Sequence, residues 1–309
     1  MAYFHCLIGG GSSGGGYELT VTCDAQFAGT SITCTDGVTT LTKTCPSASP
    51  YEVVFEIPNG GDWTISGVVG GQTVSTGVNI PTSAELIATV QQTVTIYSAK
   101  EDTISYTDID GATQTITFAS GATSKQVQIT IEPNGSSITF TSSVAKNPDD
   151  LSQDYSKTFS ITTSTTDIYL MPDAVKTLYW YGYKSSDIQY ANTSDGWQWS
   201  GGAFVSPTEQ TNYLDVSSAA SQNCIVSCSS AVTISKVLGI VEGVSVAYTQ
   251  YGQLAIAGSK NVNNNFLAQA NITVSGIHLE QTTYTSGNNY PVLSSAIGRR
   301  SKLYAMWYE

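Results

Sequence analysis

The stretch EIPNGGDWTIS (residues 56–66) recurs later in the chain as IEPNGSSITFT (residues 131–141). In both copies a Pro-Asn-Gly turn separates two short runs rich in Ile, Thr and aromatic residues, which favour strands. An Asp-Gly pair, at 36–37 and again at 110–111, precedes each copy by almost the same number of residues. Because the spacing and the flanking strand patterns both recur, the sequence predicts two copies of one module.

The rest of the chain also consists of short β-type runs bounded by turn residues, which is the spacing of β-sandwiches. We predict an all-β protein of tandem immunoglobulin-like β-sandwich modules followed by a larger C-terminal β-sandwich or jelly-roll domain. The predicted parts are an N-terminal docking tag with a Gly/Ser tether (1–16), module 1 (17–81), module 2 (82–173) and a C-terminal head domain (174–309).

The composition narrows the possible partners. Acidic residues outnumber basic ones 24 to 12 among 309 residues, and the net charge of −12 disfavours a nucleic-acid partner. No apolar run is long enough for a membrane-spanning helix, and the start of the chain lacks the features of a signal peptide. We therefore expect no membrane insertion, and synthesis in a cytoplasm from which the protein is later released.

Cysteine and histidine patterns give no metal site. The six cysteines follow no zinc spacing, and we expect them to be reduced, with the disulfide state of Cys23, Cys34 and Cys45 left open. The two histidines have no metal-spaced companion. We expect no metal, no cofactor and no catalytic residue. One alternative is a glycosidase, in which Asp187 and Asp195 would be the two carboxylates that face each other across the sugar bond.

The densest aromatic run is YWYGYKSSDIQYANTSDGWQW (residues 179–199). Tyrosine and tryptophan rings bind the apolar faces of sugars, and nearby Asn, Gln and Asp would bind the hydroxyl groups. The competing interpretation is that this run is the core of the third domain, because buried aromatics are common. If it binds glycan, the residues we expect in contact are Tyr190, Asn192, Asp195, Trp197 and Trp199.

The final segment KLYAMWYE (residues 302–309) is apolar on both alternating faces. A strand of this kind is buried on both sides, either within its own domain or against a neighbouring subunit. The second alternative predicts an oligomer interface formed by Leu303, Tyr304, Met306, Trp307 and Tyr308.

Parts of the chain resemble a known group of proteins. The stretch EVVFEIPNGGDWTISGVVGGQTVSTGVNI (residues 52–80) resembles the immunoglobulin-like or carboxypeptidase-regulatory-like sandwiches of virion proteins from tailed bacteriophages. DYSKTFSITTSTTDIYLMPDAVKTLYWYGY (residues 154–183) and KLYAMWYE resemble structural proteins of phages and prophages of gut Gram-positive bacteria.

The resemblance implies a virion component that is released by lysis. Residues 1–16 would dock on other virion proteins, and the C-terminal domain would be displayed toward a host-surface glycan. It also implies a homo-oligomer, commonly a trimer. The alternatives are a purely structural decoration protein of the capsid or tail, an extracellular glycosidase, and a bacterial adhesin.

Overall fold

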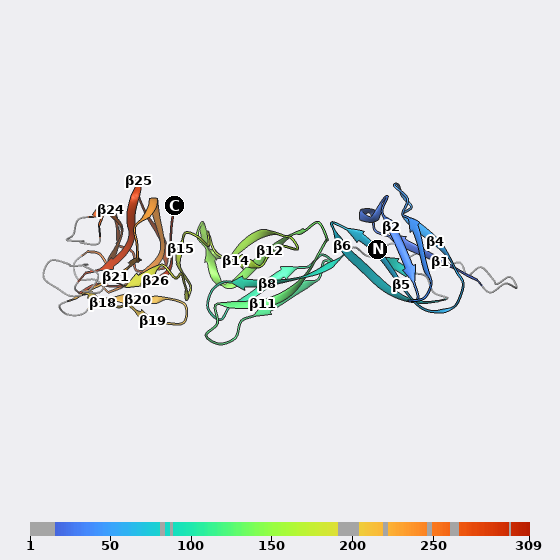
Figure 1. The fold of residues 1–309 in the computed structure, drawn as a ribbon. Helices are drawn as coiled ribbons and strands as arrows, with labels where there is room; N and C mark the ends of the chain where they lie inside the picture. The colour runs from blue at the N-terminus through green and yellow to red at the C-terminus, as the bar shows by residue number, and fades with distance from the viewer. Residues whose placement is uncertain are drawn as a thin grey trace.

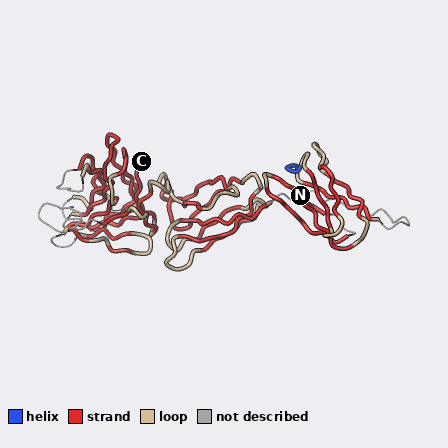
Figure 2. The backbone as a smooth tube through the Cα atoms, in the orientation of Figure 1, coloured by secondary structure: helices blue, strands red, loops and turns tan. Residues whose placement is uncertain are grey.

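A computed structural model gives the arrangement of the chain and confirms the predicted all-β class. Within the part of the chain that it describes, the one helical element is a single 3-10 turn, η1 (Ala25–Phe27), in the first sandwich (Figure 2). Two β-sandwiches and a larger C-terminal sheet follow one another in a line (Figure 1). The described residues are 16–80, 84–86, 89–190, 204–218, 222–245, 249–259, 266–296 and 298–309.

The first sandwich has a three-stranded sheet, ordered β4-β1-β7, and a four-stranded sheet, ordered β3-β2-β5-β6. Alternation explains its packing: in EVVFEI the second, fourth and sixth residues point into the core, and the others face solvent. The strands are β1 (Tyr17–Cys23), β2 (Ser31–Thr35), β3 (Thr40–Thr44), β4 (Glu52–Ile57), β5 (Gly61–Val69), β6 (Gln72–Ile80) and β7 (Ala84–Leu86).

The second sandwich repeats this topology strand for strand, with sheets ordered β11-β8-β14 and β10-β9-β12-β13. In both sandwiches the seventh strand pairs in parallel with the first. Strand β7 therefore belongs with β1, although it lies beyond residue 81. The strands are β8 (Val90–Tyr97), β9 (Thr103–Thr107), β10 (Thr113–Thr117), β11 (Ser124–Ile131), β12 (Ser136–Asn147), β13 (Asp150–Ile161) and β14 (Asp167–Tyr169).

The recurring turns occupy equivalent places. The Pro-Asn-Gly turns join β4 to β5 and β11 to β12. The Asp36 carboxylate accepts hydrogen bonds from the N–H groups of Thr39 and Val38, which lowers its pKa. In the second copy the carboxylate with this role is Asp108, two residues before the matching Asp110, because that turn is longer. Both aspartates thus serve to close hairpins.

In the C-terminal part, the described residues form one continuous sheet of twelve strands. Its path is set by β25 (His278–Ser295), whose first part pairs with β22 and whose last part pairs with β21 and β23. This shared strand folds the sheet over on itself. The other strands are β15 (Thr177–Trp180), β16 (Tyr183–Lys184), β17 (Ile188–Tyr190), β18 (Phe204–Val205), β19 (Thr208–Glu209), β20 (Leu214–Ser217), β21 (Asn223–Cys228), β22 (Val232–Ser245), β23 (Gly252–Ala257), β24 (Phe266–Ile272) and β26 (Arg300–Tyr308).

The three parts do not each have a separate hydrophobic core. The first sandwich has a core of its own around Phe55 and Trp63. The core of the second sandwich is continuous with one face of the C-terminal sheet, because Trp180, Leu238 and Trp307 belong to the same buried cluster as Phe140. A further cluster fills the fold of the C-terminal sheet. The second sandwich and the C-terminal sheet therefore share hydrophobic packing.

Candidate functional site

The contact between the second sandwich and the C-terminal sheet, called here the second junction, is built from aromatic side chains. Trp180 is fully buried on β15, and its ring meets Tyr155 of β13 edge to face at 5.0 Å between centroids. On its other side Trp180 meets Trp307 of β26 at 6.0 Å. Pairs of this geometry add stability beyond the area that they bury. The start of the aromatic run, Tyr179 to Tyr181, is thus packed inside the molecule.

The hairpin that follows Trp180 fits into the second sandwich by its tip. Tyr181 and Gly182 have positive φ angles of 42° and 95°, and the N–H of Lys100 donates to the Tyr181 carbonyl oxygen at 2.9 Å. A Cβ at Gly182 would lie 2.4 Å from the Thr211 carbonyl oxygen and 2.5 Å from the Lys100 Cβ. Only glycine fits there, and the positive φ of a buried tyrosine shows how firmly the surroundings hold this turn.

Burial at the second junction raises the pKa of its tyrosine hydroxyl groups. The pKa rises to about 12 for Tyr155 and to about 12 for Tyr181, and burial is the largest cause in both cases. Both side chains are therefore neutral over the physiological pH range, and a charged phenolate would have to be desolvated. Their role at the junction is packing.

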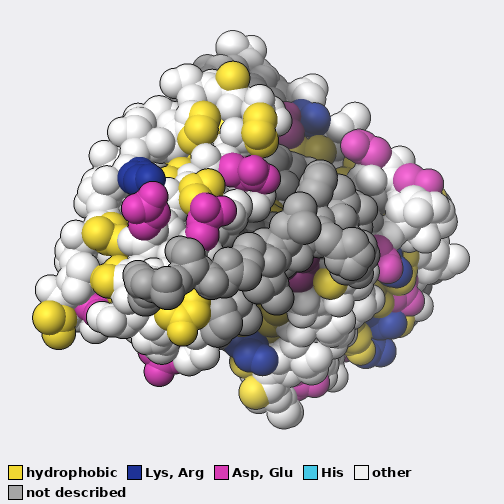
Figure 3. Space-filling model, turned by 90° about the vertical axis from the view of Figure 1, so that its right-hand side faces the viewer, with side chains coloured by type: hydrophobic (Ala, Val, Ile, Leu, Met, Phe, Trp, Pro, Cys, Tyr) yellow, Lys and Arg dark blue, Asp and Glu magenta, His cyan; other side chains and the backbone are white. Residues whose placement is uncertain are grey.

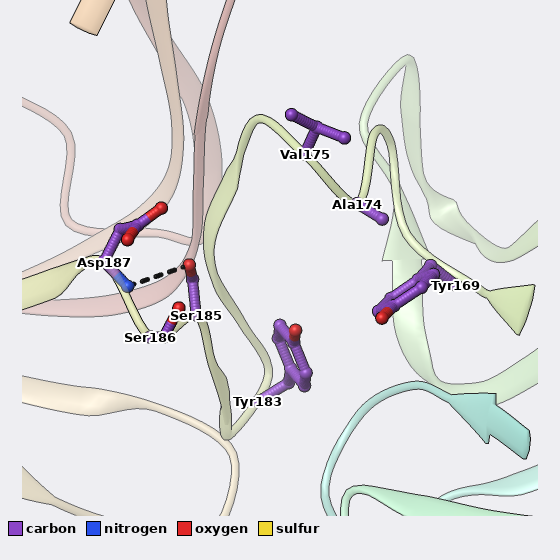
Figure 4. A pocket seen from close by; sticks show the side chains of 7 residues that line it. All are labelled: Tyr169, Ala174, Val175, Tyr183, Ser185, Ser186 and Asp187. Atoms are coloured by element: carbon purple, nitrogen blue, oxygen red, sulfur yellow. Dashed lines mark hydrogen bonds between the residues drawn. The ribbon is translucent and has the colours of Figure 1, made fainter. Parts of the chain in front are cut away.

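Beside this packed region lies a hollow of about 310 Å³ (Figure 4). The end of β14 provides one wall, the segment leading to β15 the roof, and the β16–β17 turn the other wall. Such clefts between parts of a protein are common ligand sites. Its lining residues are Tyr169, Ala174, Val175, Tyr183, Ser185, Ser186 and Asp187.

Two tyrosines face the hollow from opposite sides (Figure 4). Tyr169 stacks on Tyr97 with centroids 4.6 Å apart and planes 8° from parallel, so one ring face is covered. Tyr97 also meets Tyr183 edge to face at 6.4 Å. Burial, followed by the neighbouring tyrosines, raises the pKa of Tyr169 and Tyr183. These rings are held in place, uncharged, and half-buried.

The polar side of the hollow is the β16–β17 turn. The Asp187 N–H donates to the Ser185 Oγ at 3.1 Å (Figure 4), and the Asp187 carbonyl oxygen accepts from the Ser229 N–H at 2.8 Å. The Asp187 side chain is exposed. Among the described residues, none hydrogen-bonds its carboxylate. The backbone is therefore fixed while the carboxylate can accept hydrogen bonds from a ligand.

Of the five residues predicted to contact glycan, the structure describes Tyr190. It lies half-buried at the end of β17, where its hydroxyl donates to Glu209 Oε1 at 3.1 Å, and burial followed by the charge of Glu209 raises its pKa. Lys184 also pairs with Glu209 and, as the largest cause, lowers the pKa of that carboxyl. The remaining four, Asn192, Asp195, Trp197 and Trp199, lie outside the described residues, so the predicted contact set stays a prediction.

The predicted oligomer-interface residues lie in β26, inside the chain's own sheet between β22 on one side and β15 and β20 on the other. Leu303, Met306 and Tyr308 are buried in the fold of the C-terminal sheet, and Trp307 is buried at the second junction. Tyr304 is half-buried and donates to Glu242 Oε2 at 2.7 Å. Burial within one chain, the first of the two alternatives, accounts for the two apolar faces. The oligomer interface stays a prediction.

The structure also places the cysteines and one of the two aspartates that the sequence singled out. The described cysteines are buried and form no disulfide with one another. Burial is the largest cause that raises the pKa of Cys34 to about 11 and that of Cys228 to about 12. The described residues contain no group of three or more metal-ligating side chains and no helix long and apolar enough to cross a membrane. Asp187 lies at the hollow, whereas its glycosidase partner Asp195 lies outside the described residues.

The sequence pointed to Tyr183 as part of the aromatic run but missed Tyr97 and Tyr169. These two come from strands of the second sandwich, and each stands in a run that reads as an ordinary β-strand. Pairing of β14 with β8 places Tyr169 directly beside Tyr97. The sequence carried no signal for them, because a repeat predicts that two modules share one topology but not which strands of a module pair.

Comparisons with known proteins give weak likenesses. No protein-family model matches the chain, and no curated protein does. Among solved structures, the Bacillus anthracis TIE protein is similar over 96% of this chain and 48% of its own length, with 7% identity and a TM-score of 0.27. The chain thus spans about half the length of that protein. A tetra-tandem repeat from the extending region of a large adhesion protein is similar over 94% and 72% of the two chains, with 14% identity and a TM-score of 0.14.

Proposed function

We propose that this protein is a non-catalytic structural component of a bacteriophage particle that displays its C-terminal part for binding to a host surface. In this proposal residues 1–16 dock on the particle, and the two sandwiches act as spacers. The main support for this proposal is the arrangement of three β-units in a line (Figure 1), the last two of which share one hydrophobic core. A stiff connection of this kind would hold the C-terminal part in a set orientation on the second sandwich.

The surface chemistry supports a spacer role. Thr-Thr and Thr-Ser pairs cross the outer face of the second sandwich, where Thr139 meets Thr158 at 2.7 Å and Thr141 meets Ser156 at 2.8 Å. Seen from the end of the first sandwich, hydrophobic side chains are scattered among polar ones (Figure 3). Scattered apolar residues are normal on soluble surfaces and do not mark a contact patch. Docking through residues 1–16 stays part of the proposal, because residues 1–15 lie outside the described part.

Immunogold labelling of purified particles tests this proposal. Antibody raised against the whole chain is expected to label intact virions at regular positions. Label at the tail tip would support the receptor-binding form of the proposal, and label over every capsomer would support the decoration alternative. Virions without label, together with label on the bacterial cell surface, would overturn the proposal in favour of an adhesin.

A further inference from the structure

We propose that the hollow at the second junction binds a neutral pyranose unit of a surface polysaccharide. The rings of Tyr169 and Tyr183 would contact the C–H groups of the sugar, and the Asp187 carboxylate would accept its hydroxyl groups. The inference rests on the function proposed above and names the ligand class and the place of binding. This site lies on described residues and differs from the segment around Tyr190 to which the sequence pointed.

The first support is the state of the two rings. Tyr169 has one face covered by Tyr97 at 4.6 Å, and its side chain lines the hollow. Tyr183 pairs with Trp180 across the β15–β16 hairpin, so its backbone is fixed by the buried junction. Rings that are already ordered lose little conformational entropy when a ligand binds. The apolar C–H groups of a pyranose match such half-buried aromatic surfaces.

The second support is the Asp187 carboxylate. The backbone of Asp187 is held on both sides by Ser185 and Ser229, and the exposed carboxylate has no hydrogen-bond partner among the described residues. A carboxylate accepts hydrogen bonds with both oxygens, and adjacent sugar hydroxyls donate in the same direction. The Ser186 side chain is exposed on the same rim and can donate or accept. Aromatic surface and polar rim thus stand on the same hollow.

The third support is the exclusion of other ligand classes. A phosphate or a uronic acid would approach Asp187 on a protein of net charge −12 and would be repelled. A quaternary ammonium ion needs ring faces directed at one point within about 6 Å. Tyr97 covers one face of Tyr169 and does not itself line the hollow, so only the rings of Tyr169 and Tyr183, among the lining residues, could contact such an ion. The choline-bearing polymer in the test below distinguishes this ligand class from a sugar. The volume of about 310 Å³ lies at the small end of ligand pockets, which span about 300–1,000 Å³.

The test uses the purified full chain on an array of neutral hexose polysaccharides, uronic-acid polysaccharides, phosphate-containing polymers and a choline-bearing polymer. Retention of neutral polysaccharides alone is the expected result. The strongest array hit is then titrated by calorimetry against the wild type, Asp187→Asn and Val175→Trp. Because the carboxylate would make charge-assisted hydrogen bonds, Asp187→Asn is expected to weaken binding by about tenfold or more.

Val175→Trp tests the location independently. Val175 is 84% exposed at the roof of the hollow, so a large ring there should block entry without disturbing the core. The matched control is Asp167→Asn, an exposed acid on β14 that does not line the hollow. Thermal melts are expected to be the same for all four proteins, and the control should bind like the wild type.

Three results would overturn this site: no retention of any neutral polysaccharide, preferential retention of an anionic or choline-bearing polymer, or unchanged affinity in both Asp187→Asn and Val175→Trp. Failure here is separable from failure of the proposed function. A chain that labels on virions but binds no neutral sugar loses only the inference. A chain that binds sugar but is absent from virions loses the proposed virion role.

Discussion

The two junctions of this molecule are built differently. At the first junction, between the two sandwiches, the Gly70 turn of β5–β6 lies against the Pro133-Asn134 turn, and Val90 packs on the cores of both sandwiches. At the second junction, Trp180, Tyr155 and Trp307 form part of one continuous core. A turn-to-turn contact buries little, whereas a shared aromatic core couples the stability of its two sides. Similar β-units can thus be joined either loosely or tightly.

The largest effect is expected from Trp180→Ala. Removing a fully buried tryptophan should cost about 3–5 kcal/mol. Because the core is shared, the second sandwich and the C-terminal sheet should lose stability together. Denaturant unfolding followed by circular dichroism measures this loss. The matched variant Trp63→Ala lies in the core of the first sandwich and should weaken only that part. Equal effects of both variants on all transitions would contradict the difference between the junctions.

Gly182→Ala should also weaken the second junction. The substitution places a Cβ against the Thr211 carbonyl oxygen at a residue with φ 95°. Backbone strain and overpacking each cost about 1–3 kcal/mol. Lower urea midpoints for the second sandwich and the C-terminal sheet are expected. Gly77→Ala on β6 is the control, since a Cβ there meets nothing within 4 Å; an equal loss in that variant would contradict the tight fit of Gly182.

Asp102→Asn tests the support behind the Lys100 turn. Asp102 is fully buried and accepts hydrogen bonds from the Ser98 Oγ at 2.6 Å, the Ser142 Oγ at 2.7 Å and the Ser143 N–H at 3.1 Å. An amide group would turn a donor toward one of these donors, at a cost of about 1–3 kcal/mol. Chemical denaturation measures the loss. Asp110→Asn, exposed on a turn of the same sandwich, should change stability by less than about 0.5 kcal/mol.

Alkaline pH should weaken the second junction. Burial raises the pKa of Tyr155 from 10 to about 12, so between these values the unfolded chain releases a proton that the folded protein keeps. The stabilisation is present below pH 10 and is lost as pH rises toward 12, by on the order of 1 kcal/mol at about pH 11. Tyr155→Phe should flatten this decline in urea unfolding measured against pH. An unchanged slope in that variant would contradict the assignment.

The smallest effect is expected at the first junction. A Cβ at Gly70 would lie 2.6 Å from the Asn134 Oδ1, whereas a Cβ at the neighbouring Gly71 meets nothing within 4 Å. Both residues have positive φ, so alanine strains the hairpin at either one. The difference between Gly70→Ala and Gly71→Ala should be below about 1 kcal/mol in stability. It should appear instead as a change in the small-angle scattering profile, as the two sandwiches change their relative orientation.

Turn chemistry made part of the fold predictable. The Pro-Asn-Gly turns and the alternation in EVVFEI are local signals, since each depends on a few neighbouring residues. The site was harder to predict. Tyr183 was visible in the aromatic run, but Tyr97 and Tyr169 reach the hollow only because β14 pairs with β8. The pattern also could not tell whether Trp180 faced solvent or core, because both are compatible with an aromatic strand.

The sequence by itself determined the all-β class and the repeated turns, because strand periodicity and turn residues act over short distances along the chain. It also determined the net charge of −12, which is a sum over composition. Only the tertiary structure decided that the start of the aromatic run is buried at the second junction and that β26 is an inner strand. The tyrosine-lined hollow next to that junction was likewise decided by the tertiary structure. Those outcomes depend on which distant strands become neighbours. In a strand that is apolar on both faces, which neighbour covers each face depends on that pairing and cannot be read from the strand alone.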